Sequence, residues 1–442
     1  MSSAPLLGAC ELPGEAKRRS PAWLRRLIDT EEAWVQLQFA VPMVLTNMSY
    51  YAIPLVSVMF SGHLGNVHLA GATLGNSWAT VTGYAFVSSL IMSAVVSVLI
   101  SVLWLFTEPL LVCLHQEPEV SRAAAEFIRY QIPGLFAYSF LQCLLRYVQT
   151  QCIVVPLVVC SMVPFLLHIC LNYLLVNVLG LGLTGASLAI SATFWVSCLM
   201  LLAYVMASKE FDGTWKGFSA EAFSYVLPTI KLAMPSAIMV CLEYWAIELL
   251  VLIAGLLPGS TESTSLIAIC ASTQAISYMI TYGFSAAVRY HPVSNEIGAG
   301  GQRGAVMVTM KLSVLLALSF ILLLIVGHGL WASLFTGSAV MAAKFAAITP
   351  LLTISIVLDS AQGVLGCGWQ HLAAMTNLVA FYLAGMPVAI FLAFKLNLYT
   401  HGLWLGLITG LACQTSVMVL ITLRTKWSNL VDAMEKTDGY VA

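Results

Sequence analysis

The chain has 442 residues, of which 60% are hydrophobic and 9% are charged, and its formal net charge is −1. A soluble domain carries roughly 25% charged residues, so this chain cannot cover itself with a water-compatible surface. The balanced charge, with no cluster of Lys and Arg, excludes a nucleic-acid partner. The 11 cysteines follow no metal-site or disulfide spacing and are interpreted as small residues of a membrane interior, so we expect no metal and no cofactor.

Apolar segments recur along the chain after a polar, basic stretch at residues 1–32, which is expected to be a cytoplasmic tail. Each segment has about 20 residues or more, enough to cross about 30 Å of hydrocarbon as a helix. Twelve spans are predicted near 33–60, 68–87, 88–107, 123–147, 153–176, 183–206, 229–257, 264–288, 307–329, 341–365, 372–394 and 401–423. The sequence therefore predicts an all-α, multi-pass membrane protein of about 12 helices.

The longest polar connection divides these spans six and six. We expect an N-lobe at 33–208, a cytoplasmic connection at 209–228, a C-lobe at 229–423 and a cytoplasmic tail at 424–442. Basic residues in the 209–231 and 289–311 connections place both on the cytoplasmic side by the positive-inside rule. A weak repeat supports two lobes, because FAVP at 39–42 is echoed by LAMP at 232–235. Parallel repeats are typical of transporters that alternate access around a central site.

The second and third spans are predicted to be short. Residues 68–107 must cross twice, although two spans of about 20 residues leave nothing for a turn. A single long helix would reverse the orientation of everything downstream and would violate the charge bias. A hairpin of short or partly inserted helices, breaking near Gly83, is the favoured interpretation.

Three acidic residues lie within predicted spans: Glu243, Glu248 and Asp359. A carboxylate at the bilayer centre costs about 2.5–3.5 kcal/mol on insertion scales, and desolvation favours its protonated form, which suits a group that binds and releases protons. Glu248 points about 140° away from Glu243 on a helix, so a structural role for Glu248 stays open. Gln362 lies one turn after Asp359, on the same face. These four residues are the candidates for proton coupling and substrate binding.

Neutral polar and aromatic residues within the spans are candidates for the wall of a substrate cavity. An aromatic ring can stack on a flat or cationic substrate, although packing and interhelical hydrogen bonding are the alternative roles. The candidates are Asn47, Tyr50, Asn76, Tyr244 and Tyr278. Among the histidines, His168 and His328 lie deepest in the predicted spans.

The chain resembles the multidrug and toxic compound extrusion (MATE) family, specifically its plant DETOXIFICATION-type branch. The resemblance rests on an ordered set of segments: SGHLG at 61–65, LAGA at 69–72, YVQTQ at 147–151, VPL at 155–157, PSA at 235–237, CLEYW at 241–245, ELLVL at 248–252, GLLP at 255–258, VSNEIGAG at 293–300, LDS at 358–360 and GCGWQ at 366–370. The resemblance implies a two-lobed transporter fold, with Glu243 in the acidic motif of the seventh helix.

Three departures from the family pattern stand out. A family stretch that completes the second helix is absent after Val87, at the place where the repeat also shows a deficit. About five small and basic residues are absent between Leu365 and Gly366, and the family's Ser-Thr-Arg is replaced by an irregular AVRYHP at 287–292. A loss of about 26 residues after Val87 is roughly a full span and bears on transport competence more than on fold.

The favoured function is a secondary antiporter that exports organic cations, alkaloids, flavonoids or organic anions in exchange for protons. The alternative is a transport-impaired truncated isoform that acts as a non-transporting membrane protein. An enzyme is not expected, since the sequence has no metal-spaced cluster, no Ser/His pair and no nucleotide-binding Gly-rich loop. The expected partners are a small organic substrate, protons and the lipid bilayer of a vacuolar or plasma membrane, and the chain is expected to be monomeric.

Overall fold

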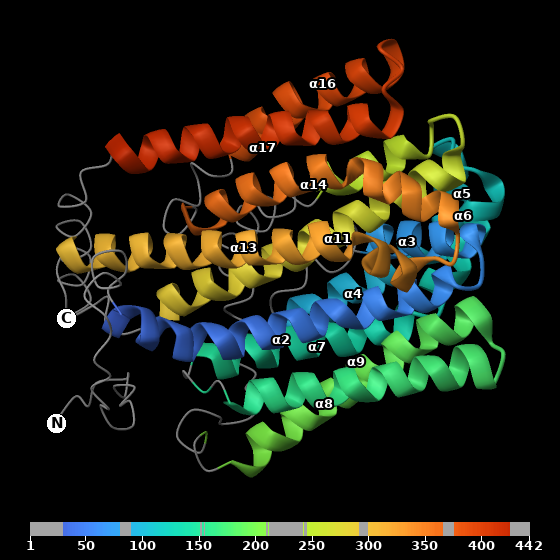
Figure 1. Ribbon diagram of the computed structural model, residues 1–442. Coiled ribbons are helices and arrows are strands. Elements are labelled where there is room, and N and C mark those ends of the chain that lie inside the picture. Colours follow the sequence, from blue (N-terminus) through green and yellow to red (C-terminus); the bar gives the residue numbers. More distant parts are fainter. Residues whose placement is uncertain are drawn as a thin grey trace.

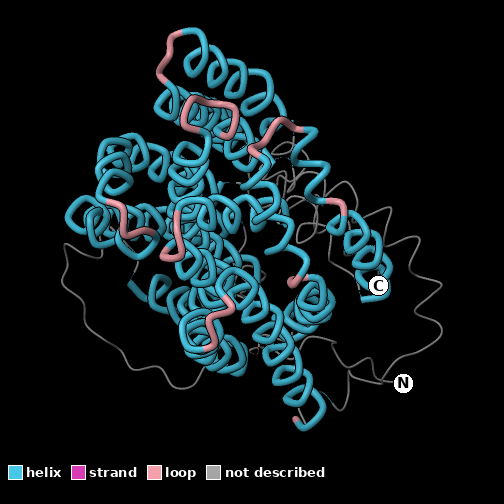
Figure 2. Tube along the Cα trace, turned by 90° about the vertical axis from the view of Figure 1, so that its right-hand side faces the viewer, coloured by secondary structure: helices cyan, strands magenta, loops and turns pink. Residues whose placement is uncertain are grey.

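The structure is a computed structural model, and it describes residues 30–79, 90–150, 155–208, 245–290, 299–365 and 375–424, with the single residues 153, 211 and 242. Every regular element in these ranges is a helix, as Figures 1 and 2 show. The first half contributes α2 (Thr30–Gly62), α3 (Asn66–Ala79), α4 (Leu90–Leu105), α5 (Thr107–Cys113), α6 (Pro118–Arg129), α7 (Ile132–Thr150), α8 (Val155–Asn172), η2 (Tyr173–Val178) and α9 (Gly182–Ala207). The second half contributes the helix Trp245–Ala254, α11 (Ser260–Tyr290), α13 (Ala299–Phe335), α14 (Ala339–Leu365), η5 (Leu378–Gly385), α16 (Met386–Ile390), η6 (Phe391–Lys395) and α17 (Tyr399–Arg424).

Eight helices of the described ranges are long and apolar enough to cross a membrane. One of them, α13, is apolar on its outer face, where Leu323, Val326 and Leu330 are more than two-thirds exposed. Exposure of such an apolar surface to water is unfavourable, whereas in a bilayer the lipid tails cover it. The predicted all-helical membrane fold is therefore confirmed.

The long helices run side by side, and α2 begins at the same end of the bundle at which α17 ends (Figure 1). In the first half, α7 and α8 pack against α9, and α3 packs against α6. In the second half, α14 packs against α11, α13 and α17, while η5, α16 and η6 pack against α17. The two halves meet where α2 and α3 contact α11, and where α2 contacts α13.

Small residues allow the helices to approach closely. On α17, Gly402, Gly406 and Gly410 recur every four residues and face η5, α16 and η6. A Cβ added at Gly406 would lie 2.3 Å from the Cβ of Ala389, so only glycine fits there. Without a hydrophobic driving force between helices in lipid, such close packing is a main source of their association.

The second and third helices border residues that the structure does not describe. Helix α3 is described over Asn66–Ala79 and α4 from Leu90 onward, so the predicted shortness of these two spans stays a prediction. Helix α4 has 16 residues, and α5 continues it toward the same end of the bundle. The predicted break near Gly83 and the boundary after Val87 lie outside the described residues, as do most of the connection 209–228 and both tails.

The span predicted at 123–147 differs from the structure, where the chain forms two helices. Helix α6 ends at Arg129 and α7 begins at Ile132, with Pro133 in its first turn. Proline has no N–H to donate and its ring crowds the preceding turn, so a helix commonly breaks there. The sequence interpretation overlooked this break because hydropathy alone does not register it.

Candidate functional site

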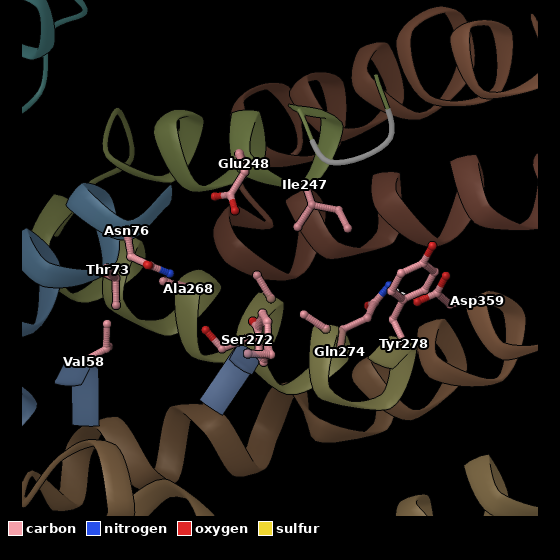
Figure 3. A pocket seen from close by; sticks show the side chains of 13 residues that line it. Val58, Thr73, Asn76, Ile247, Glu248, Ala268, Ser272, Gln274, Tyr278 and Asp359 are labelled. Carbon is pink, nitrogen blue, oxygen red and sulfur yellow. Dashed lines mark hydrogen bonds between the residues drawn. The ribbon is translucent and has the colours of Figure 1, made fainter. Parts of the chain in front are cut away.

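A cavity of about 80 Å³ lies between the two halves. By the roughly 10–15 Å³ that one water needs, it has room for several waters. Helices α2 and α3 supply one side, and the helix Trp245–Ala254, α11 and α14 supply the other (Figure 3). It is lined by Tyr51, Val58, Thr73, Asn76, Ile247, Glu248, Ala268, Ala271, Ser272, Gln274, Ala275, Tyr278 and Asp359.

The lining combines two carboxyl groups with aromatic rings. Asn76 and Thr73 lie at one end of the cavity in Figure 3, and Asp359 lies at the other end with Gln274 and Tyr278. Among the described lining residues there is no Lys, Arg or His. Acidic groups and aromatic ring faces are the chemistry that suits a cationic ligand.

Asp359 is held on α14, where it is 6% exposed. The amide Nε2 of Gln274, on α11, donates a hydrogen bond to its Oδ2 at 3.4 Å. Directly before it, the carbonyl of Leu358 accepts a hydrogen bond from Thr415 of α17 at 3.1 Å. The carboxyl group is therefore positioned by three helices of the second half.

The structure brings together four of the nine residues that the sequence singled out: Glu248, Asp359, Asn76 and Tyr278. Tyr50 does not line the cavity, since it is 8% exposed and its hydroxyl donates to the carbonyl of Cys160 at 3.3 Å. Asn47 is half-buried on α2, away from the lining. Glu243 and Tyr244 lie outside the described residues, and the side chain of Gln362 on α14 does too.

Sequence reasoning missed four polar residues of the lining: Tyr51, Thr73, Ser272 and Gln274. Tyr51 follows Tyr50, and one step along a helix turns the side chain by about 100°, so only the packing of α2 decides which ring faces the cavity. Gln274 carried a usable signal, because a glutamine inside a predicted span needs a hydrogen-bond partner.

The two histidines that the sequence singled out differ in burial. His168 lies in a polar cluster, with Nδ1 2.8 Å from the Thr193 hydroxyl, and Nε2 2.8 Å from the Asn172 amide and 3.2 Å from Ser57. This cluster joins α2, α8 and α9 and is buried within the first half. His328 is half-buried, and its Nδ1 lies 2.9 Å from the carbonyl of Ile325. No group of three potential metal ligands occurs in the described part of the chain.

The two halves also touch at the end of the bundle opposite to the start of α2, which we call the closed end. Gln116, before α6, donates to the carbonyl of Leu252 at 3.0 Å. Glu117 accepts hydrogen bonds from the hydroxyls of Thr261 at 2.6 Å and Ser260 at 2.8 Å, at the start of α11. These bonds, that from Thr261 first, hold the pKa of Glu117 below its ordinary value of 4.5, because they stabilise the carboxylate.

A bundle of membrane-length helices with an acidic cavity between its halves defines a multi-pass membrane transport protein rather than an enzyme. The profile of the MatE family matches residues 83–174 and 235–394. The chain is 46% identical to Protein DETOXIFICATION 18 of Arabidopsis thaliana, covering 95% of this chain and 97% of that protein. It is 36% identical to Protein DETOXIFICATION 16 of the same plant, over 90% of this chain and 89% of that protein.

Solved structures agree with the sequence comparison. The crystal structure of the eukaryotic MATE transporter AtDTX14 superposes with a TM-score of 0.82 and 28% identity, covering 92% of this chain and 99% of that one. A multidrug resistance MATE family transporter in an inward-facing conformation superposes with a TM-score of 0.72 and 17% identity, covering 92% and 99%, and shows the shared fold. The chain belongs to the MATE family, in its plant DETOXIFICATION branch, and is a multidrug and toxic compound transporter by family.

Proposed function

We propose that this protein is a secondary antiporter that exports small organic cations in exchange for protons. The observation that carries the proposal is the buried carboxyl of Asp359 in a cavity between the two halves, with Glu248 and two tyrosines on the same wall. A carboxylate in a membrane interior is costly unless it is protonated or paired with a cation. Proton and organic cation would therefore compete for one charge, and this competition couples their movements.

The three acidic residues would have different roles, in proton binding and in substrate binding. Asp359 and Glu243 would bind the protons, Asp359 because it is the more deeply buried acid of the cavity and Glu243 because of its place in the resembling motif. Glu248, which is half-buried on the cavity wall, would contact the substrate. A bound proton would neutralise the site and weaken its hold on the cation.

The proposal is tested with purified protein in vesicles whose lumen is acidic, by following uptake of ethidium, tetraethylammonium and citrate. Asp359→Asn and Glu243→Gln are expected to abolish proton-driven uptake without loss of membrane insertion, since amides keep the shape but do not titrate. Glu248→Gln is expected to raise KM for the cations. The matched control is Glu126→Gln on the exposed face of α6, which should transport like the original chain. Proton-driven uptake at the original rate in both Asp359→Asn and Glu243→Gln would refute the coupling roles.

The proposed orientation places both termini and the connections 209–231 and 289–311 in the cytoplasm. The shared end at which α2 begins and α17 ends supports it, because an even number of crossings returns the chain to its starting side. Epitope tags inserted in the two connections should label only after permeabilisation. External labelling of the 209–231 tag would mean that residues 68–107 cross once.

A second candidate function, that of a transport-impaired isoform, is supported by the comparison with a family member. The alignment with DETOXIFICATION 18 extends over 457 positions, more than the 442 residues of this chain, so the relative has residues that this chain lacks. A chain with an incomplete second span would be a transport-impaired isoform. Inserting a family-like segment of about 26 residues between Val87 and Ser88 should then raise both melting temperature and flux. Equal values with and without the insertion would remove this candidate.

A further inference from the structure

A chain of buried hydrogen bonds leads from Asp359 back into the packing of the second half. The indole Nε1 of Trp404, on α17, lies 3.2 Å from the hydroxyl of Ser355 on α14. That hydroxyl lies 2.8 Å from Oε1 of Gln274 on α11. The other atom of the amide, Nε2, lies 3.4 Å from Oδ2 of Asp359, and this last bond is drawn in Figure 3. All four side chains are buried.

The chemistry of the donors fixes the direction of each bond. An indole N–H can only donate, so the oxygen of Ser355 accepts from Trp404. Ser355 has one proton and two acceptors at the same distance, because the carbonyl of Leu352 also lies 2.8 Å from its hydroxyl. When the proton goes to Gln274, the amide oxygen is occupied and the NH₂ group faces Asp359. This arrangement suits an ionised Asp359, which can only accept.

The carbonyl of Leu352, which can also accept the hydroxyl proton of Ser355, allows the opposite arrangement. A protonated Asp359 has an O–H to donate, and an amide oxygen is its natural partner. If the amide of Gln274 turns over, its oxygen faces Asp359 and its NH₂ group donates to the second lone pair of Ser355. The hydroxyl proton of Ser355 then points to Leu352, and every group in the chain keeps a partner.

We propose that Gln274 is a positioning residue for proton coupling, whose amide turns over when Asp359 takes up or releases its proton, with Ser355 as the pivot. One proton enters Asp359 from the cavity and leaves by the same route, and no covalent bond of the other residues changes. The inference rests on the proposed function, because it assumes that Asp359 carries the coupled proton.

The surroundings explain why an adaptable amide is needed here. Among the described residues, the other titratable groups that line the cavity are Glu248 on the helix Trp245–Ala254, Tyr51 on α2 and Tyr278 on α11. None of these three is cationic at neutral pH, so the hydrogen bond from the Gln274 amide contributes to the stabilisation of an ionised Asp359. Because α11 also packs against α2 and α3, a change at Gln274 reaches the contact between the halves.

The test follows the infrared spectrum and the transport rate of the full-length protein as functions of pH. In the original chain, a carboxyl band should titrate with pH, and the same band should be absent in Asp359→Asn. A glutamine carbonyl band should shift in the original chain over the same pH range. Gln274→Met, similar in volume but without an amide, should remove that second band. It should move the pH midpoint of ethidium uptake upward by roughly one unit, because the hydrogen bond lost to the carboxylate is stronger than the one lost to the protonated acid.

The pivot is tested separately. Ser355→Ala should shift the midpoint in the same direction, and Ser355→Thr should restore it, because threonine keeps the hydroxyl. The matched control is Thr273→Val, next to Gln274 on α11, whose hydroxyl accepts from Trp331 at 2.9 Å and lies outside this chain of bonds. Its midpoint should equal that of the original protein.

The outcomes separate the two proposals. Proton-driven uptake that survives in Asp359→Asn overturns the proposed function and this inference together. A loss of uptake in Asp359→Asn, combined with an unchanged glutamine band and midpoint in Gln274→Met, overturns the inference alone. If a variant proves inactive in transport, the infrared titration of its purified form still decides the question.

Discussion

At the scale of single residues, the cavity wall combines acidic groups with aromatic rings, and the contribution of each ring to substrate binding can be tested separately. Tyr278 lies beside Asp359 and Gln274 on the cavity wall (Figure 3). Tyr278→Ala is expected to raise KM for ethidium by about 2- to 30-fold, the range of a cation–π contact of about 0.5–2 kcal/mol, whereas Tyr278→Phe keeps most of it. Initial rates of uptake at several ethidium concentrations measure the effect.

The matched control for this prediction is Tyr50→Phe, since Tyr50 is packed inside the first half and does not line the cavity. An equal rise of KM in Tyr50→Phe would show that the effect is not local to the cavity. Unchanged KM in Tyr278→Ala would remove this ring from substrate binding.

The sequence could predict which residue types would line the site, but not which individual residues of each type. An acidic residue inside an apolar span is recognisable from its cost, and on this basis the sequence singled out Asp359 and Glu248, which both line the cavity. The choice between Tyr50 and Tyr51 depends on the rotation of α2 against α11, which no property of the two residues encodes. The partners of Gln274 could not be predicted either, because they depend on how α11 packs against α14.

At the scale of helices, the packing of α17 makes a quantitative prediction. Gly406→Leu places a side chain where Cα and Cβ of Ala389 already lie within 2.4 Å of an added Cβ, so α16 and α17 must separate. Overpacking of this kind costs about 1–3 kcal/mol or more. The melting temperature in detergent, followed with a thiol-reactive dye that reports exposure of the buried Cys160 and Cys270, should fall by several degrees.

The control is Gly327→Ala on α13, where an added Cβ meets no atom within 4 Å. This variant should melt at or slightly above the original temperature, because alanine is the better helix former. A Gly406→Leu protein as stable as the control would mean that this close approach is not needed.

Helix lengths were the most predictable part of the fold, because a run of about twenty apolar residues indicates a membrane-spanning helix. The shortness of the second span follows from residue counting alone and stays a prediction, because residues 80–89 lie outside the described part of the chain. Breaks within a span, such as the one between α6 and α7, depend on local backbone geometry and were missed.

At the scale of the whole molecule, the closed end is held by contacts that respond to pH. The lowered pKa of Glu117 means that its contribution to closure is complete above the ordinary carboxyl value of 4.5 and is lost as the pH falls through the lowered value. Glu117→Gln should therefore loosen the closed end at neutral pH, and acid should loosen it only in the original chain. For a largely exposed group the expected rise in the open population is about two- to fivefold.

Spin labels on the exposed Leu181 and Val340, one in each half, would report the separation of the halves at this end. Glu119→Gln is the matched control, since Glu119 is exposed in the first turn of α6. Distances that do not respond to Glu117→Gln at any pH would show that Glu117 does not hold the end closed.

The length of α13 has a consequence for the lipids around this protein. Its apolar part includes Val314–Phe335, 22 residues that measure about 33 Å, so it is at least as long as the hydrocarbon of a sterol-rich membrane is thick. In a thinner bilayer the helix must tilt, and each ångström of hydrophobic mismatch costs a fraction of a kcal/mol. Because α13 packs along α14, which carries Asp359, tilting would change the packing next to the proposed coupling site. Bilayer thickness would then act on this transporter as an effector with no binding pocket.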